Sequence, residues 1–364
     1  MRRMPRTTGW TFALVAILGG CGSDPGRADD GAVETLDAVD AEAATEAAVD
    51  ADAEPDGEPD DGFGPDDVGG PDDVGGPDDA VEPDDVGPDA PDGGGYVPGS
   101  LASCWTDAAC PRVMAVAHGG AWELTGAPYN SDAALRNAYD LGCDGVKIDV
   151  RVTADDVPVI AHSSPIEYFE SLDCAGRRIE EMTADEVTRC HRLPSLTERF
   201  QRLDDVLDYL RGKMAVQLCV KRSEDIRRTI DEIHALAAED FAFIELGPGD
   251  LASLIPTLVG ADTVWYLVNI ASDLGEVDTL LDVVRNPRAF LFEFDPGIDV
   301  ATLTPERLHP AGVRSFTYDS ATPLSVAAIQ SYFEHGYDVV STQSAANAVE
   351  ARRLVHAARG VSPP

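Results

Sequence analysis

The sequence predicts an α/β fold of the TIM (β/α)8-barrel type, preceded by an export signal and a long acidic segment. Beyond residue 200, apolar runs of strand length alternate with amphipathic runs of helix length, which is the pattern of a parallel sheet covered by helices. Residues 99–364 are enough for one such barrel. Nearly every apolar run ends in a polar residue, and in a barrel these ends meet at one mouth.

Residues 1–21 resemble the signal peptide of a bacterial lipoprotein. Met1–Arg6 is basic, and the apolar core Trp10–Leu18 is too short to span a bilayer. Leu18-Gly19-Gly20-Cys21 has the form of a lipobox, in which cleavage before the cysteine frees its thiol to carry a diacylglycerol. We therefore expect a protein of the bacterial cell envelope that is anchored in a membrane through lipidated Cys21. The following Gly22-Ser23 favours the outer membrane.

Residues 22–98 have the composition of a disordered linker. Residues 24–100 hold 26 acidic residues and one arginine, so 25 of the 39 net negative charges lie there. Repeats of Gly-Pro-Asp-Asp-Val-Gly cannot form a core, and charge repulsion together with proline keeps such a chain extended. The acidic runs lack the glycine and glutamate spacing of an EF-hand loop, so we expect a spacer rather than a calcium site.

Two histidines follow apolar runs in the first part of the barrel domain. Val113–Ala117 is predicted to be a buried strand, and His118 follows it directly before two glycines. Ser131 then begins a helix with apolar residues at helical spacing. After a turn too short for a crossover helix, the apolar run Val157–Ala161 ends at His162. A second imidazole is therefore expected near the first.

The strand Gly145–Val150 alternates apolar and polar residues, so Lys147 and Asp149 project to the same side and into one pocket. Further strands are predicted at 214–220, 241–246, 263–269, 289–295, 314–319 and 338–342. Helices are predicted at 203–211, 223–238, 248–258, 274–285, 323–334 and 344–358. With the three earlier runs there are nine candidate strands, so one of them must lie outside an eight-stranded ring.

The order of these motifs resembles the glycerophosphodiester phosphodiesterase family, whose fold is the phospholipase C-like phosphodiesterase barrel. The family has His-Arg-Gly, then Glu-Asn-Thr, then Glu-x-Asp-Val, and a second histidine in Val-x-x-His-Asp. The corresponding segments here are His118-Gly119-Gly120, Tyr129-Asn130-Ser131, Lys147-Ile148-Asp149 and the run ending at His162. The likeness continues through 176–186, 214–221, 315–319 and 336–342, which covers nearly the whole globular part.

The resemblance implies a phosphoric diester hydrolase that acts on glycerophosphodiesters or phospholipid head groups. Cleavage of a phosphodiester needs a base, an acid and positive charge near the nonbridging oxygens. An imidazole titrates near about 6.5, so both of its protonation forms are accessible at neutral pH. We therefore assign the acid and base roles to His118 and His162. We assign phosphate binding to Lys147, Lys221 and Asn130.

The family holds a divalent cation on carboxylates, most of which are missing here. Tyr129 and Lys147 each stand where the family has a glutamate, and Gln217-Leu218-Cys219-Val220-Lys221 stands where it has Asn-Ile-Glu-Ile-Lys. Only Asp149 survives from that ligand set. An ammonium has no lone pair for a metal and repels a cation, so the sequence favours a metal-independent enzyme in which Lys147 replaces the cation.

Two alternatives stay open. In the first, a calcium or magnesium ion binds at a non-standard site built from Asp149 with Glu245, Glu293 or Asp295. In the second, the barrel is catalytically inactive and serves as a surface binding module. Nucleic-acid binding is not expected, because the domain is net negative and shows no basic stripe. We expect a monomer whose ligand is a small or lipid-borne phosphodiester.

The cysteines and aromatic residues complete the expectations. Two pairs are spaced for local disulfides, Cys104 with Cys110 and Cys174 with Cys190. Two more lie beside predicted strands and are expected to be buried apolar side chains, Cys143 and Cys219. Three aromatic residues are assigned to packing rather than to the site, Trp122, Tyr129 and Trp265.

Overall fold

The computed structural model describes residues 96–97, 99–271, 277–278, 281, 288–321 and 323–362. The predicted signal peptide with Cys21 lies outside the described residues, as do nearly all of the linker 22–98 and most of the predicted helix 274–285. None of the helices within the described ranges is long and apolar enough to cross a bilayer.

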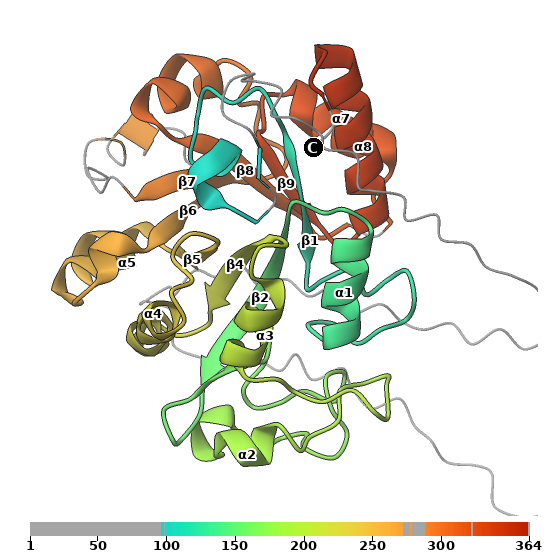
Figure 1. Cartoon of the computed structure of the whole chain (residues 1–364), viewed down its shortest axis with the longest axis vertical. Coiled ribbons are helices and arrows are strands. Elements are labelled where there is room, and N and C mark those ends of the chain that lie inside the picture. The colour runs from blue at the N-terminus through green and yellow to red at the C-terminus, as the bar shows by residue number, and fades with distance from the viewer. Residues whose placement is uncertain are drawn as a thin grey trace, which may run out of the picture. The chain divides into compact units, whose positions relative to one another are not determined.

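Eight parallel strands form a closed barrel, which confirms the predicted fold class (Figure 1). The ring runs in the spatial order β1-β9-β8-β7-β6-β5-β4-β2, and β2 pairs with β1 to close it. The bounds are β1 Met114–His118, β2 Gly145–Val152, β4 Ala215–Val220, β5 Ala242–Leu246, β6 Trp265–Ala271, β7 Ala289–Phe294, β8 Arg314–Asp319 and β9 Val339–Thr342. The ninth strand, β3 (Pro158–Ile160), is antiparallel to β2 and lies outside the ring. The extra candidate strand is therefore the run before His162.

Helices cover the outside of the barrel (Figure 1). They are α1 Asp132–Asp140, α2 Ala184–Val187, α3 Leu203–Leu210, α4 Ile226–Ala235, α5 Pro248–Ser253, α7 Val326–Glu334 and α8 Ala345–Arg359. Short 3-10 or π turns occur at Leu101–Trp105, Ile179–Glu181, Ser223–Asp225, Ile255–Thr257, Ala261–Thr263, Thr304–Leu308 and His309–Ala311. Ser131 caps α1 as predicted, because its hydroxyl accepts from the Ala134 amide at 3.2 Å.

The amino-terminal half of the barrel interior is filled by apolar side chains. Trp105, from the turn before β1, packs on Phe243 of β5 with 5.8 Å between ring centroids. Trp265, at the start of β6, packs on Phe290 with 5.5 Å between centroids. Trp265 is thus a packing residue, as predicted. Since apolar groups occupy this end, the polar side chains of the strands gather at the carboxyl-terminal end.

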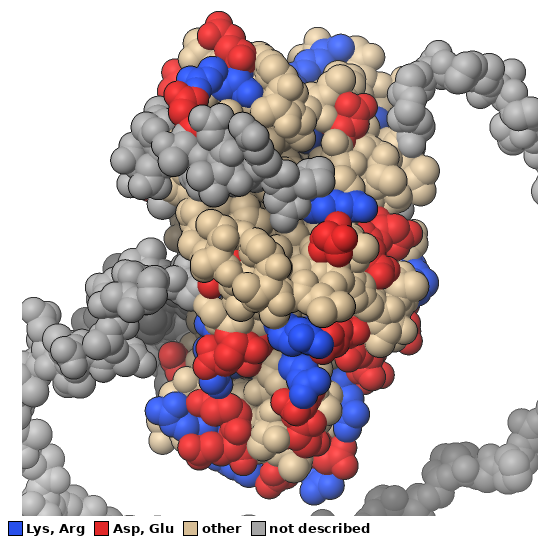
Figure 2. Space-filling view, turned by 90° about the vertical axis from the view of Figure 1, so that its left-hand side faces the viewer, with Lys and Arg blue, Asp and Glu red and all other residues tan. Residues whose placement is uncertain are grey.

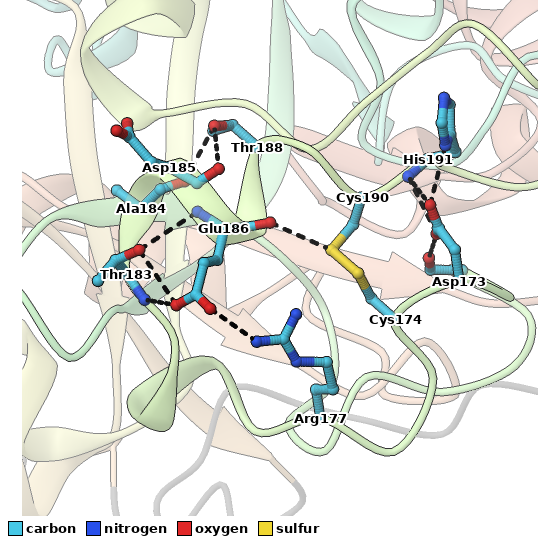
Figure 3. The surroundings of a disulfide bond; sticks show 11 residues. Asp173, Cys174, Arg177, Thr183, Ala184, Asp185, Glu186, Thr188, Cys190 and His191 are labelled. Atoms are coloured by element: carbon cyan, nitrogen blue, oxygen red, sulfur yellow. Dashed lines mark hydrogen bonds and ion pairs between the residues drawn. A yellow bond between two sulfur atoms is a disulfide. The ribbon is translucent and has the colours of Figure 1, made fainter.

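Residues 163–202 form an insert between β3 and α3. A disulfide between Cys174 and Cys190 joins two parts of the insert beside α2 (Figure 3). Ion pairs such as Arg177 with Glu186, 3.1 Å apart, lie on its surface. Figure 2 shows basic and acidic residues intermixed at the lower end of the molecule, where α2 lies in Figure 1. The insert is therefore a stapled, polar-surfaced segment that directly follows His162.

Both predicted disulfides are confirmed, since Cys104 is also bonded to Cys110. Cys143 is a buried free thiol, as predicted. Cys219 is fully buried on β4, as predicted.

Candidate active site

His118 is the last residue of β1, and its imidazole lies against two tyrosine rings. It stacks on Tyr318 of β8, with 4.1 Å between centroids and 17° between planes. Tyr129, from the loop before α1, lies 5.6 Å away between centroids, and its hydroxyl oxygen is 3.2 Å from Nδ1 of His118. Only 6% of His118 is exposed. These contacts hold the imidazole in one orientation.

Asp149 of β2 is the centre of a buried hydrogen-bond network. The ammonium nitrogens of Lys147 and Lys221 lie 2.5 Å and 2.7 Å from its Oδ1. The Tyr129 hydroxyl and the Asn130 amide donate to its Oδ2 at 2.9 Å and 2.8 Å. Asp149 is fully buried. Each carboxylate oxygen therefore has two donors.

The two ammonium groups share a single carboxylate. Burial by itself would raise the pKa of Asp149, but the charges of Lys147 and Lys221 outweigh it and hold that pKa well below its usual value. Burial also lowers the pKa of Lys221, and the attraction of Asp149 offsets this only in part. With all three groups ionised, the cluster carries one net positive charge. It is therefore suited to a monoanion such as a phosphodiester.

Gly119 makes room for Tyr129. Its φ is +71°, and a Cβ at this position would lie 1.9 Å from the Tyr129 ring. The loop that carries the ring is fixed to the same turn, because the Asn130 amide donates to the Gly119 carbonyl at 2.9 Å. Asn130 itself has a φ of 59°. Gly119 stands where the His-Arg-Gly motif has its arginine, and the Tyr129 ring fills the space that a side chain at this position would need. The two replacements therefore depend on each other.

His162 is positioned by the insert and by β2. Its amide and that of Ser163 each donate to the carboxylate of Glu170 at 2.9 Å. The guanidinium of Arg151 donates to the His162 carbonyl at 2.9 Å. The imidazole meets the Tyr129 ring edge-on, with 6.0 Å between centroids. Tyr129 therefore adjoins both of the predicted catalytic histidines.

Both imidazoles are neutral at neutral pH. Burial, reinforced by the charge of Lys147, lowers the pKa of His118 well below its usual value. Burial lowers the pKa of His162 to about 4, against the attraction of Asp149. A bound anion near these rings would oppose the lysine charges and favour protonation of one imidazole.

The residues do not fit the divalent cation that the family's carboxylates hold. The four donors around Asp149 occupy both of its oxygens. Within the described part of the chain, no group of three or more His, Cys, Asp or Glu is arranged to hold a metal ion. Glu245 accepts from Gln217 at 2.8 Å. Burial and the charge of Glu245 raise the pKa of Glu293 well above its usual value, and a protonated carboxyl is a poor ligand.

Comparison with known proteins shows which family part of the barrel domain resembles. Residues 122–241 match the model of the glycerophosphoryl diester phosphodiesterase family. Over these residues the chain is similar to that family. It is similar to glycerophosphodiester phosphodiesterase 1 of Rattus norvegicus, at 32% identity over 30% of this chain and 31% of the relative. The mouse protein of the same name is 33% identical over 32% of this chain and 36% of the relative. The match thus spans about a third of each curated relative.

Solved structures share the barrel. A glycerophosphoryl diester phosphodiesterase from Parabacteroides distasonis has a TM-score of 0.58 at 18% identity, covering 69% of this chain and 90% of its own. The glycerophosphodiester phosphodiesterase of Agrobacterium tumefaciens has a TM-score of 0.52 at 19% identity, covering 65% of this chain and 99% of its own. At these identities the likeness shows the fold alone.

The site residues that the sequence predicts within the barrel domain lie close together in the structure. They are His118, His162, Lys147, Lys221, Asn130 and Asp149; Cys21 lies outside the described residues. The assignment of Tyr129 to packing alone is wrong, because its hydroxyl contacts both Asp149 and His118. Its place in a family carboxylate motif was the signal that could have revealed it. Glu170, which fixes the backbone at His162, gave no comparable signal.

Proposed function

We propose that this protein is a phosphoric diester hydrolase acting on glycerophosphodiesters or phospholipid head groups. The similarity of residues 122–241 to the glycerophosphoryl diester phosphodiesterase family supports the reaction class. The observation that carries the proposal is the sharing of Asp149 by Lys147 and Lys221, beside His118. A phosphodiester monoanion would neutralise the excess positive charge and place phosphorus near an imidazole base.

The two imidazoles divide the proton transfers. One accepts a proton from the attacking oxygen as that oxygen bonds to phosphorus. The other donates a proton to the leaving alkoxide oxygen as its bond to phosphorus breaks. Both imidazoles are neutral in the free protein. The imidazole that acts as the acid therefore becomes protonated when the anionic substrate binds. Lys147 supplies the positive charge that a divalent cation supplies elsewhere in the family.

The proposed reaction is tested by following phosphodiester cleavage with and without a chelator. Substrates are a water-soluble glycerophosphodiester and phospholipid vesicles, so that the two sources of the head group are distinguished. The variants are His118→Ala and Lys147→Glu, with His335→Ala as the control because His335 is an exposed residue at the end of α7. Activity that survives chelation and is lost in both site variants supports the metal-independent mechanism.

Other outcomes contradict parts of the proposal. Activity that is abolished by the chelator and restored by calcium or magnesium would show that a metal ion, and not Lys147, supplies the positive charge. Binding of a phosphodiester without turnover of either substrate would favour a surface binding module instead.

We also propose that the mature protein is a lipoprotein of the bacterial outer membrane, attached through Cys21 and spaced from the surface by residues 22–98. The lipobox and the acidic composition support this location. Metabolic labelling with a fatty acid tests it: wild type should incorporate label and partition into the membrane, and Cys21→Ser should do neither.

A further inference from the structure

We propose that Tyr129 is a positioning residue that holds His118 in the tautomer with its proton on Nδ1, which makes His118 the general base. This assignment rests on the proposed hydrolase function and separates two imidazoles whose roles the sequence leaves interchangeable. It gives a function to a tyrosine that stands where the family has a carboxylate.

The geometry places one hydroxyl between two partners. The oxygen of Tyr129 lies 2.9 Å from Oδ2 of Asp149 and 3.2 Å from Nδ1 of His118. Lys147 also points at this oxygen, at 3.5 Å. A phenol has a single proton, so it donates to only one of these neighbours at a time.

The direction of the Tyr129 proton follows from Asp149. Two ammonium groups lie within 2.7 Å of Oδ1 of Asp149, so this carboxyl is ionised and acts only as an acceptor. The contact between the Tyr129 oxygen and Oδ2 therefore needs the phenol proton between them. The phenol oxygen then presents a lone pair to His118. An unprotonated Nδ1 would face that lone pair repulsively, so Nδ1 carries the proton.

Packing keeps the His118 ring from turning away. The ring stacks on Tyr318, and the indole nitrogen of Trp122 donates to the backbone carbonyl of His118 at 3.2 Å. Gly119 leaves the space that the Tyr129 ring fills, since a Cβ there would overlap it. The phenol is thus built into the turn that carries His118.

The tautomer assigns the two proton transfers. With Nδ1 protonated, Nε2 of His118 has a free lone pair and can accept a proton from the attacking oxygen. His162 is then the acid that protonates the leaving alkoxide. Asp149, Tyr129 and His118 form a chain in which a phenol stands between the carboxylate and the imidazole, and the carboxylate orients the base through it.

Nuclear magnetic resonance with 15N-labelled imidazoles measures the tautomer directly. The His118 signals are assigned by their loss in His118→Gln. In wild type, at a pH where His118 is neutral, Nδ1 should show a protonated, pyrrole-type signal and Nε2 an unprotonated, pyridine-type signal. In Tyr129→Phe, which keeps the ring and removes only the hydroxyl, this preference should be lost. A wild-type Nε2–H tautomer would overturn the proposal even if the variant is unstable.

Kinetics test the consequence. Tyr129→Phe should lower kcat by roughly 10²-fold with KM changed less than about threefold, because the base is misoriented while phosphate binding persists. Tyr266→Phe is the matched control, since it removes a buried hydroxyl that donates to the Ala261 carbonyl at 2.6 Å, away from the site. The proposal is wrong if His118 keeps the Nδ1–H tautomer in Tyr129→Phe, or if the kcat of Tyr129→Phe equals that of Tyr266→Phe. If wild type cleaves no diester, the proposed function fails, while the spectrum still decides the tautomer.

Discussion

The Tyr129 ring occupies the space into which a side chain at Gly119 would project, 1.9 Å from the position of its Cβ. Gly119→Ala should therefore lower the free energy of unfolding by about 1–3 kcal/mol through steric overlap, in addition to the cost of a positive φ for alanine. Chemical denaturation measures the loss. Adding Tyr129→Ala to Gly119→Ala should remove the steric overlap and restore the part of the unfolding free energy that the overlap costs. The double-mutant cycle should therefore give a coupling free energy of about 1 kcal/mol or more.

Gly142 provides the control for backbone strain. Its φ is +79°, close to that of Gly119, but a Cβ there would meet no atom within 4 Å. Gly142→Ala should show the cost of the positive φ alone and no coupling to Tyr129. Equal losses in the two alanine variants would show that Tyr129 yields to the added methyl, contrary to the packing argument.

Asp149 should be essential for stability as well as for activity. Asp149→Asn removes the charge that compensates two buried ammonium groups, and breaking a buried pair costs about 3–5 kcal/mol. Denaturation at neutral pH checks this value. Asp132→Asn is the control, because its pair with Arg136 is at the surface and contributes only about 0–1 kcal/mol. Similar losses of unfolding free energy in both variants would mean that water already solvates the ammonium groups of Lys147 and Lys221.

The order of strands and helices was predictable because both follow from local periodicity. The (β/α)8 ring and most element bounds agree with the sequence-based expectation. Which strand lies outside the ring was not predictable, since β3 is as apolar as the barrel strands. Its antiparallel pairing with β2 depends on the short turn between them, and its register is a tertiary property.

The site was predictable where it depends on strand geometry. Lys147 and Asp149 lie two residues apart on one strand, so their contact follows from the period of a strand. The role of Tyr129 depends instead on a loop that folds back onto the turn after β1, and on the absence of a side chain at Gly119. Such a contact between a loop and a turn has no periodic signature in the sequence.

The pH dependence of activity should follow the lowered pKa of the acid. His162 has a pKa of about 4 through burial, and in the free protein its protonated fraction falls about tenfold per pH unit above that value. The value of kcat/KM should therefore decline as the pH rises from 5 to 7. Lys221 lowers the pKa of His162 by its charge, so Lys221→Met should shift the decline to higher pH. A flat profile over this range would exclude a protonated His162 as the acid.

The disulfide of the insert should matter to catalysis as well as to stability. Replacing Cys174 and Cys190 by serine opens a loop closed over 16 residues and should cost about 3 kcal/mol. Because Glu170, which precedes Cys174, holds the amides of His162 and Ser163, kcat should fall as well. Replacing Cys104 and Cys110 opens a loop of 6 residues at the opposite end of the barrel and should cost about 2 kcal/mol without changing kcat. Denaturation and initial-rate kinetics separate the two pairs, and an equal kcat in both double variants would show that the insert holds His162 without its disulfide.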